Sequence, residues 1–199
     1  ILWGSAIPVI KTGYRLMQVD SSDIASQIVF AGIRFTLAGI LVLIFASIRE
    51  KKVMLPDRTL FKYAVPVCLA QTVVQYFFFY IGVAHTSGVK GGIISGLGNF
   101  IAILLSCLIF RNERMTVRKI IGCALGFAGV VVINLMGNSL DMEFMLTGEG
   151  FILIAQLSYG ISTVLINLFS KKVSPVVLSG TQFTMGGIVL TLIGAKMGG

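Results

Sequence analysis

Long apolar runs alternate with short polar gaps along this chain, and each run has about the length that crosses a bilayer. A membrane-spanning helix needs roughly 20 predominantly apolar residues. The pattern therefore predicts a fold of the all-α class, a polytopic bundle of transmembrane helices. The seven predicted spans are residues 1–17, 24–48, 60–83, 88–110, 117–136, 148–169 and 175–195.

The gaps between these runs differ in charge, which predicts the orientation of the chain. The connections after the second, fourth and sixth predicted spans are rich in cations, whereas the alternate gaps hold Asp20, Asp23, Asp141, Glu143 and Glu149. Cytoplasmic loops carry the excess of lysine and arginine. We therefore expect a multi-pass protein of the cell (inner or cytoplasmic) membrane with a cytoplasmic N-terminus. The cations in these three connections are Arg49, Lys51, Lys52, Arg58, Lys62, Arg111, Arg114, Arg118, Lys119, Lys171 and Lys172.

The composition excludes an ordinary soluble protein. Of the 199 residues, 56% are hydrophobic and 12% are charged, about half the charged share of soluble domains. The net charge of +8 lies in the short gaps, so it is read as topology control, and we expect no nucleic-acid partner. Cys68, Cys107 and Cys123 lie inside apolar runs without metal-ligand spacing, so we expect neither disulfides nor a metal site.

Two stretches near the start of the chain resemble two stretches near its end, in the same order. Residues 3–5 (Trp-Gly-Ser) correspond to residues 159–162 (Tyr-Gly-Ile-Ser), and residues 34–40 (Arg-Phe-Thr-Leu-Ala-Gly-Ile) align with residues 182–188 (Gln-Phe-Thr-Met-Gly-Gly-Ile). These matches indicate an internal duplication. A unit of five helices, an odd number, inserts its second copy upside down, and inverted repeats place the substrate site near the bilayer midplane.

These motifs resemble the EamA family of the drug/metabolite transporter superfamily. The resemblance lies in Trp3-Gly4-Ser5 followed by Lys11, in Arg34-Phe35, and in the stretch from Gly82-Val83-Ala84 through Glu113-Arg114 to Gly122 and Gly129. It implies ten helices in two inverted five-helix repeats, no organic cofactor, and export or exchange of metabolites. Residues 1–146 would be the first repeat and residues 147–199 the first two helices of the second, a segment of a longer protein. Asn99 stands where the family commonly carries a helix-kinking proline.

Glycines at four-residue spacing predict close helix packing. Gly88, Gly92 and Gly96 share one face of the fourth predicted span, and Gly122 and Gly126 share one face of the fifth. Small residues four apart let helix backbones approach closely in a membrane. The alternative is scattered glycine at the normal membrane frequency.

Two cations inside the predicted spans are candidates for substrate binding. Lys11 and Arg34 lie within spans, where each charge costs about 2.5 to 3.5 kcal/mol on insertion scales. One interpretation is that they attract the carboxylate or phosphate of a substrate. The alternative is that they extend to lipid headgroups or pair with Asp20, Asp23 or Glu149.

Polar side chains inside the spans are further candidates. Gln71 and Gln75 lie one turn apart on the third predicted span, with Tyr76 nearby; this face either lines a polar cavity or forms a hydrogen-bonded contact between helices. Trp3 and Tyr159 occupy matching places in the repeat and either bracket a substrate or anchor at an interface. The remaining candidates for the cavity are Ser95, Asn99, Gln156, Asn167 and Gln182. The only histidine, His85, is read as a solvated loop residue or a pH sensor.

The function that fits these features is secondary active transport of a small polar metabolite, such as an amino acid, out of the cell or in exchange. We expect a small-molecule substrate and the lipid bilayer as partners, no cofactor and no enzymatic activity, with a homodimer as an open alternative. A seven-helix receptor or a non-transporting assembly protein is the alternative function. A serine protease of the membrane is unsupported because Ser95 and His85 lack the spacing, and an ATP-driven pump is unsupported because no phosphate-binding glycine loop occurs.

Overall fold

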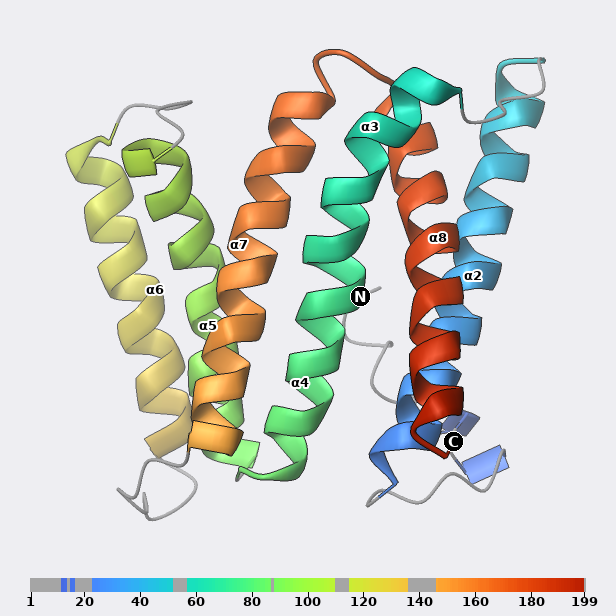
Figure 1. The fold of residues 1–199 in the computed structure, drawn as a ribbon. Helices are drawn as coiled ribbons and strands as arrows, with labels where there is room; N and C mark the ends of the chain where they lie inside the picture. The colour runs from blue at the N-terminus through green and yellow to red at the C-terminus, as the bar shows by residue number, and fades with distance from the viewer. Residues whose placement is uncertain are drawn as a thin grey trace.

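The structure of the chain is a computed structural model that describes residues 12–13, 15–16, 23–51, 57–86, 88–109, 115–135 and 146–198. Every regular element within these ranges is helical, as the all-α prediction requires (Figure 1). The six predicted spans from residue 24 onwards differ from the described helices by at most a few residues at each end. The elements in chain order are α2 (Ile24–Arg49), α3 (Arg58–Val67), η1 (Cys68–Val74), α4 (Gln75–Ala84), α5 (Gly88–Leu104), η2 (Leu105–Ile109), α6 (Val117–Leu135), η3 (Leu146–Gly150), α7 (Phe151–Phe169) and α8 (Pro175–Lys196).

Local sequence signals set the starts of three helices. Asp23 caps α2 by accepting a hydrogen bond from the Ser26 backbone N–H, and Asp57 caps α3 by accepting one from the Leu60 backbone N–H. Such caps satisfy backbone donors that have no partner within the helix. Pro175 occupies the first turn of α8, where its missing N–H costs nothing.

Five helical stretches of the described chain are long and apolar enough to cross a membrane. They are Ile24–Arg49, Arg58–Ala84, Lys90–Cys107, Leu146–Phe169 and Pro175–Lys196. The chain is therefore a polytopic membrane protein. The predicted span at residues 1–17 lies almost wholly outside the described residues. Helix α6 lies where a span was predicted but is not among the five, so the total of seven stays a prediction.

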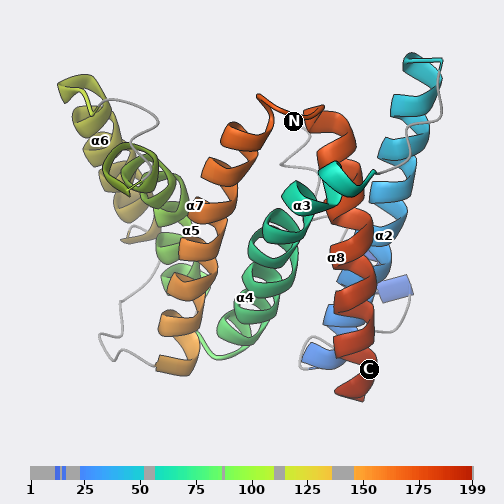
Figure 2. The ribbon, with the colours of Figure 1, turned by 45° about the horizontal axis from the view of Figure 1, so that its top comes forward.

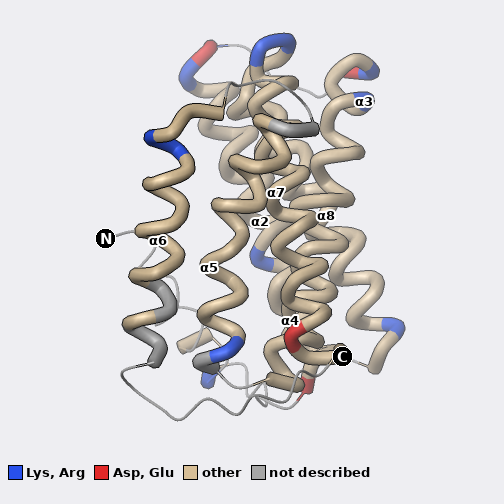
Figure 3. The backbone as a smooth tube through the Cα atoms, turned by 90° about the vertical axis from the view of Figure 1, so that its left-hand side faces the viewer, with Lys and Arg blue, Asp and Glu red and all other residues tan. Residues whose placement is uncertain are grey.

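Successive spans run in opposite directions, and α3, η1 and α4 form one of these spans, so the connections between spans gather at two ends of the bundle (Figure 1). Figure 1 shows the α2–α3, α5–α6 and α7–α8 connections at one end and the α4–α5 connection at the other. Figure 3 shows lysines and arginines concentrated at the first of these ends. These are the connections that were predicted to be cytoplasmic from their charge, and we call this the cation-rich end.

The span Arg58–Ala84 occupies the middle of the bundle. Helix α7 packs on one side of it and α8 on the other, with α5 and α6 beyond α7 and α2 beyond α8 (Figures 1 and 2). Many large apolar side chains point away from the bundle, including Leu41 at 65% and Leu125 at 68% exposure. Such exposure suits a lipid environment rather than water.

Helices α2 and α8 pack backbone to backbone along a seam of small residues. A Cβ atom added to Gly39 would lie 2.5 Å from the Thr184 backbone nitrogen and 2.6 Å from the Gly180 carbonyl oxygen. One added to Gly194 would lie 2.9 Å from the Ala25 carbonyl oxygen. Only glycine permits this approach, because real Cβ atoms do not come so near to backbone atoms.

Two clusters of apolar side chains lie at different levels of the bundle, one nearer the cation-rich end than the other. The cluster towards the cation-rich end contains Ala46, Leu60, Ala64, Val177 and Leu178. The other cluster contains Ile28, Ala31, Phe35 and Leu190, with Tyr76, Phe77, Tyr80 and Phe183 packed against it. Both clusters draw on α2, the long central span and α8, so these three stretches share one core.

The predicted close packing of glycines is absent at Gly122 of α6, and it stays a prediction for Gly88, Gly92 and Gly96 of α5. No described atom lies within 4 Å of a Cβ added to Gly122, so the expected close packing is wrong there, and Gly126 meets only the Phe100 ring at 3.2 Å. The closest helix approach is the seam between α2 and α8 instead.

Candidate functional site

The central span carries a wide helical turn at the level of its polar residues. Pro66 lies inside α3, where it lacks the N–H needed for the regular helical bond. The helix then continues as the π-helical segment η1, and the Gln75 N–H donates to the Ala70 carbonyl five residues back. π-helical turns of this kind frequently occur at functional sites. The apolar pattern predicted the helix but not this turn.

Gln182 of α8 joins two side chains of η1. Its Oε1 accepts a hydrogen bond from the Thr72 hydroxyl at 2.8 Å, and its Nε2 donates to Gln71 Oε1 at 3.1 Å. Thr72 and Gln182 are almost fully buried, at 0% and 1% exposure. The pair Gln71 and Gln182 therefore forms a hydrogen-bonded contact between helices, one of the two arrangements considered from the sequence.

The side chain of Gln75, one turn further along the central span than Gln71, differs from it in hydrogen bonding. Its side-chain Oε1 is buried without a hydrogen-bond partner among the described residues. A buried acceptor without a partner costs about 1–3 kcal/mol. Gln75 thus differs from Gln71 in carrying a buried acceptor that no described group satisfies.

Tyr159 of α7 and Asn99 of α5 meet in the interior of their spans. The Tyr159 hydroxyl donates to Asn99 Oδ1 at 3.3 Å. Gly98 makes room for this contact, because an added Cβ would collide with Gln156 and would lie 3.0 Å from the Tyr159 ring. Asn99 is exposed on the surface of the described chain. An exposed amide in the middle of a span needs polar surroundings, since hydrocarbon offers it no partner.

An aromatic cluster around Tyr76 lies beside the half-buried cation Arg34. The Phe35 ring meets the Tyr76 ring edge-on at 4.7 Å and stacks on the Phe183 ring at 5.5 Å. The Arg34 guanidinium carbon lies 5.1 Å from the centre of the Phe35 ring. Tyr76 lies on α4, which packs against α2 and against α7.

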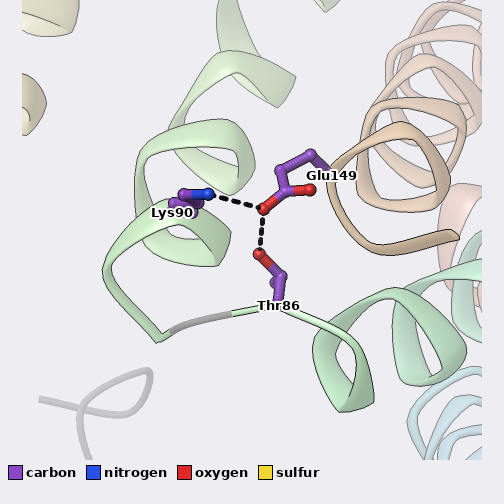
Figure 4. A network of polar contacts seen from close by, with 3 residues as sticks. All are labelled: Thr86, Lys90 and Glu149. Carbon is purple, nitrogen blue, oxygen red and sulfur yellow. Dashed lines mark hydrogen bonds and ion pairs between the residues drawn. The ribbon is translucent and has the colours of Figure 1, made fainter. Parts of the chain in front are cut away.

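Two of the partners expected for Arg34, Asp23 and Glu149, bind other groups, and the third, Asp20, lies outside the described residues. Asp23 accepts hydrogen bonds from Ser26 at the start of α2. Glu149 of η3 forms an ion pair with Lys90 of α5 at 3.5 Å and accepts a hydrogen bond from the Thr86 hydroxyl at 2.6 Å (Figure 4). This network joins the ends of α4, α5 and α7 opposite the cation-rich end. No described carboxylate lies within 4 Å of the Arg34 guanidinium.

The remaining predicted residues are separate from these contacts or lie outside the described chain. Trp3 and Lys11 lie outside the described residues, so their predicted roles stay predictions. Ser95 is half-buried on α5. His85 is exposed at the end of α4, with Nδ1 2.7 Å from the Ile81 carbonyl oxygen, which matches the expected solvated position.

Sequence reasoning missed Thr72 and Ser158. The Thr72 hydroxyl bonds Gln182, and the Ser158 hydroxyl donates to the Ala70 carbonyl of η1 at 2.7 Å. Serine and threonine in helices commonly bond their own backbone, as Thr163 does here. The sequence carries no signal that separates these two uses, although Thr72 lies between the two glutamines that were selected.

The positions aligned in the internal repeat make matching contacts across the seam. Gly39 faces Thr184 and Gly180, and Gly187 faces Thr36 and Gly32. The alignment of residues 34–40 with residues 182–188 pairs each residue with the one 148 positions away. Exchanging the residues of each such pair turns either contact into the other. Phe35 stacks on Phe183, the residue aligned with it. These antiparallel helices are thus related by an approximate two-fold axis near the stacked rings.

Several known proteins similar to the chain are named as uncharacterized transporters. The EamA-like transporter family matches residues 1–135. The uncharacterized transporter YvbV of Bacillus subtilis is 27% identical over 98% of the chain and 59% of its own length, and an uncharacterized transporter of Archaeoglobus fulgidus is 25% identical over 94% and 62%. A chloroplastic WAT1-related protein of Arabidopsis thaliana is 25% identical over 96% of the chain and 44% of its own length.

The chain spans about three fifths of the length of the Bacillus and Archaeoglobus relatives. No solved structure matches it. The family match covers more than half of the chain and includes the stretches that carry Arg34, Gln75, Tyr76 and Asn99. Together with its several membrane-spanning helices, this match places the chain in the EamA-like transporter family.

Proposed function

We propose that the chain is the main part of a secondary active transporter that exports or exchanges a small polar metabolite, such as an amino acid. Family membership supports transport, and no step requires an enzymatic reaction or a cofactor. We further propose a location in the cytoplasmic membrane with the cation-rich end and the N-terminus in the cytoplasm, because lysines and arginines collect on that side. The receptor and assembly alternatives have no observation in their favour.

The substrate pathway in this proposal borders α2, α4, α5 and α7. The observation that carries it is Asn99, an exposed amide in the interior of α5 that accepts a hydrogen bond from Tyr159. Lipid offers no hydrogen bonds at this depth, so the surface with Asn99 borders water or substrate rather than hydrocarbon. Tyr76 lies on α4, which packs against both α7 and α2.

The matching contacts between α2 and α8 support two inverted repeats. We propose that residues 1–146 form the first repeat and that residues 147–199 begin the second. The approximate two-fold axis at Phe35 and Phe183 supports the upside-down relation of the two copies. Transporters of this design place the substrate near the midplane, between the repeats. Transport then requires the remaining helices of the second repeat, and a homodimer stays an open alternative.

The test is uptake and efflux of labelled amino acids, nucleobases and sugars in proteoliposomes. The chain is compared with a version extended to ten helices by the C-terminal part of the Bacillus relative. Tyr159→Phe removes only the hydroxyl on Asn99, and we expect a loss of roughly fivefold or more in flux. Thr163→Val is the matched control, because this hydroxyl bonds only the Tyr159 carbonyl of its own helix.

Saturable flux in the extended version, reduced by Tyr159→Phe and kept by Thr163→Val, would support both the function and the pathway. Flux that is equal in the two variants would move the pathway away from Tyr159. Absence of flux across the whole panel from folded protein would refute transport.

A further inference from the structure

An ion pair lies where α4, α5 and α7 meet, at the end of the bundle opposite the cation-rich end (Figure 4). Lys90 Nζ is 3.5 Å from Glu149 Oε1, and the Thr86 hydroxyl donates to the same oxygen at 2.6 Å. Glu149 is only 4% exposed, and the Lys90 side chain is 17% exposed. A carboxylate near the membrane surface could stay hydrated, so the burial of Glu149 requires a reason.

Stability is a weak reason for a buried ion pair. Removing two charges from water costs about as much as their attraction returns. The best-attested use of such a pair is to select one arrangement of the elements that it joins. The pair between Lys90 and Glu149 therefore selects the arrangement in which η3, at the start of α7, lies against α5 and the end of α4.

The backbones of α4 and η3 also touch at this place. A Cβ atom added to Gly148 would lie 2.6 Å from the His85 carbonyl oxygen and 3.2 Å from Thr86 Cβ. One added to Gly82 would lie 2.9 Å from the Gly148 carbonyl oxygen. Small residues permit such close approach of helix backbones in a membrane. This end of the bundle is therefore closed by direct contact between α4 and η3.

The ion pair lies between one membrane surface and the contact of Asn99 with Tyr159. Lys90 and Asn99 are nine residues apart on α5, and Glu149 and Tyr159 are ten residues apart along η3 and α7. At 1.5 Å per residue each stretch is about 14 Å long, which is half of a hydrocarbon core of roughly 30 Å. Asn99 and Tyr159 therefore lie near the midplane, and the ion pair joins the same two helices near the surface.

The ion pair also crosses the boundary between the two proposed repeats. Thr86 and Lys90 belong to the first repeat, and Glu149 belongs to the second. Alternating access requires the two repeats to separate at one face while they stay in contact at the other. Glu149 lies in the π-helical turn η3 between Gly148 and Gly150. Such turns frequently occur at functional sites, and the two glycines give this backbone the freedom to change its course.

Resting on the transport function proposed above, we infer that Glu149, Lys90 and Thr86 form a gate that closes the substrate pathway at this end. In the structure the gate is closed, because Glu149 holds η3 against α5 and the end of α4. On opening, Glu149 separates from Lys90 and Thr86, and water hydrates both charges. The start of α7 then moves away from α4, which opens a route to Asn99 and Tyr159. In the orientation proposed above, this route leads to the outside of the cell.

The test measures how fast a thiol reagent reaches the pathway from each face of the membrane. Ser95→Cys is the reporter, because Ser95 is half-buried and lies one turn from Asn99 on the side nearer Lys90. The three native cysteines, which are free, are replaced by alanine. A charged, membrane-impermeant methanethiosulfonate is added to intact cells for the outer face and to inverted membrane vesicles for the cytoplasmic face. Both the chain and the ten-helix version described above are labelled.

Three variants alter the gate, and a fourth is the matched control. Glu149→Gln removes one charge, Thr86→Val removes only the hydroxyl, and Glu149→Gln with Lys90→Met removes both charges. The control is Lys172→Gln. Lys172 Nζ lies 5.8 Å from the centre of the Tyr63 ring, so this cation also contacts the central span from the end of α7, but at the cation-rich end.

Glu149→Gln should raise labelling from the outer face roughly tenfold or more, because it removes a charge-assisted contact that exists only in the closed state. Thr86→Val should raise it by less. The variant without both charges should also label faster than the parent, even where its unfolding free energy recovers, because the ion pair is still missing. Labelling from the outer face should stay unchanged in Lys172→Gln.

Two results would overturn the gate and leave transport to its own flux assay. One is labelling from the outer face within about twofold of the parent in both folded variants that lack the Glu149 charge. The other is an equal increase from both faces, because the ion pair would then only stabilise the fold. Faster labelling from the outer face alone, without flux of any substrate by folded protein, would sustain the opening movement and refute transport.

Discussion

One added methyl group in the seam between α2 and α8 should separate two helices that now touch through their backbones. The change is Gly39→Ala. The new Cβ would lie 2.5 Å from the Thr184 backbone nitrogen and 2.6 Å from the Gly180 carbonyl oxygen. Ordinary contacts of this kind need about 3.5 Å. The helices must therefore move apart by roughly 1 Å, since neither obstacle is a flexible side chain.

The cost of this movement follows from the loss of packing along the seam. A gap of roughly 0.5–1 Å removes a quarter to a half of the attraction between facing atoms. Overpacking of a close contact costs about 1–3 kcal/mol, and we expect Gly39→Ala near the upper end. The matched control is Gly122→Ala on α6, which no described atom approaches within 4 Å. It should be neutral or slightly stabilising, because alanine is the better helix former.

Equilibrium unfolding of the purified protein in mixed detergent micelles, followed by circular dichroism, measures both changes in unfolding free energy. The reasoning fails if Gly39→Ala is as stable as the parent to within about 0.5 kcal/mol. It also fails if Gly122→Ala is equally destabilised, because the effect would then come from the residue type rather than from the contact.

Three further changes test other contacts. Gln182→Leu should lower the unfolding free energy by about 1–3 kcal/mol, because it leaves two hydrogen-bonding side chains of η1 without their partner; detergent unfolding measures this, and no change would contradict it. Glu149→Gln should cost roughly 3 kcal/mol because Lys90 would stay largely buried without its counter-charge, and adding Lys90→Met should recover part of that loss in a double-mutant cycle. Hydrogen bonds from the Ser26 side chain and backbone hold the pKa of Asp23 below its ordinary value of 3.8, so its stabilising effect is present above pH 3.8 and is lost as the pH falls further; the stability difference from Asp23→Ala should shrink in that range and stay constant at neutral pH.

The course of the described helices was largely predictable from the sequence. The predicted span at residues 24–48 matches α2 (Ile24–Arg49), and that at residues 60–83 matches the helix Arg58–Ala84. Apolar run length decides these limits, because the bilayer has a fixed thickness. The wide turn η1 within Arg58–Ala84 was not predictable in this way. Its apolar residues read the same in a regular or a widened helix.

The sequence indicated which side chains belong to the candidate site, but not which of them bind one another. Gln71, Gln75 and Gln182 stood out because amides are costly in hydrocarbon. Which of them are bonded depends on how α8 packs on η1, and the sequence does not contain that distance. Gly122 shows the same limit. Its four-residue spacing from Gly126 is typical of a close helix contact, but the closest contact in the described chain joins α2 and α8.

In the proposed duplication, the aligned contacts between α2 and α8 also define the kind of surface that the ancestor of the two copies needed. When a helix contacts the equivalent helix of the other copy across a two-fold axis, the same surface patch is used on both sides, as in an isologous dimer. Such a patch must be self-complementary before the copies are joined. Glycine and threonine on both sides meet this condition, because each glycine makes the space that the opposite threonine fills. In the proposed duplication, the seam is a homodimer interface that gene fusion has made permanent.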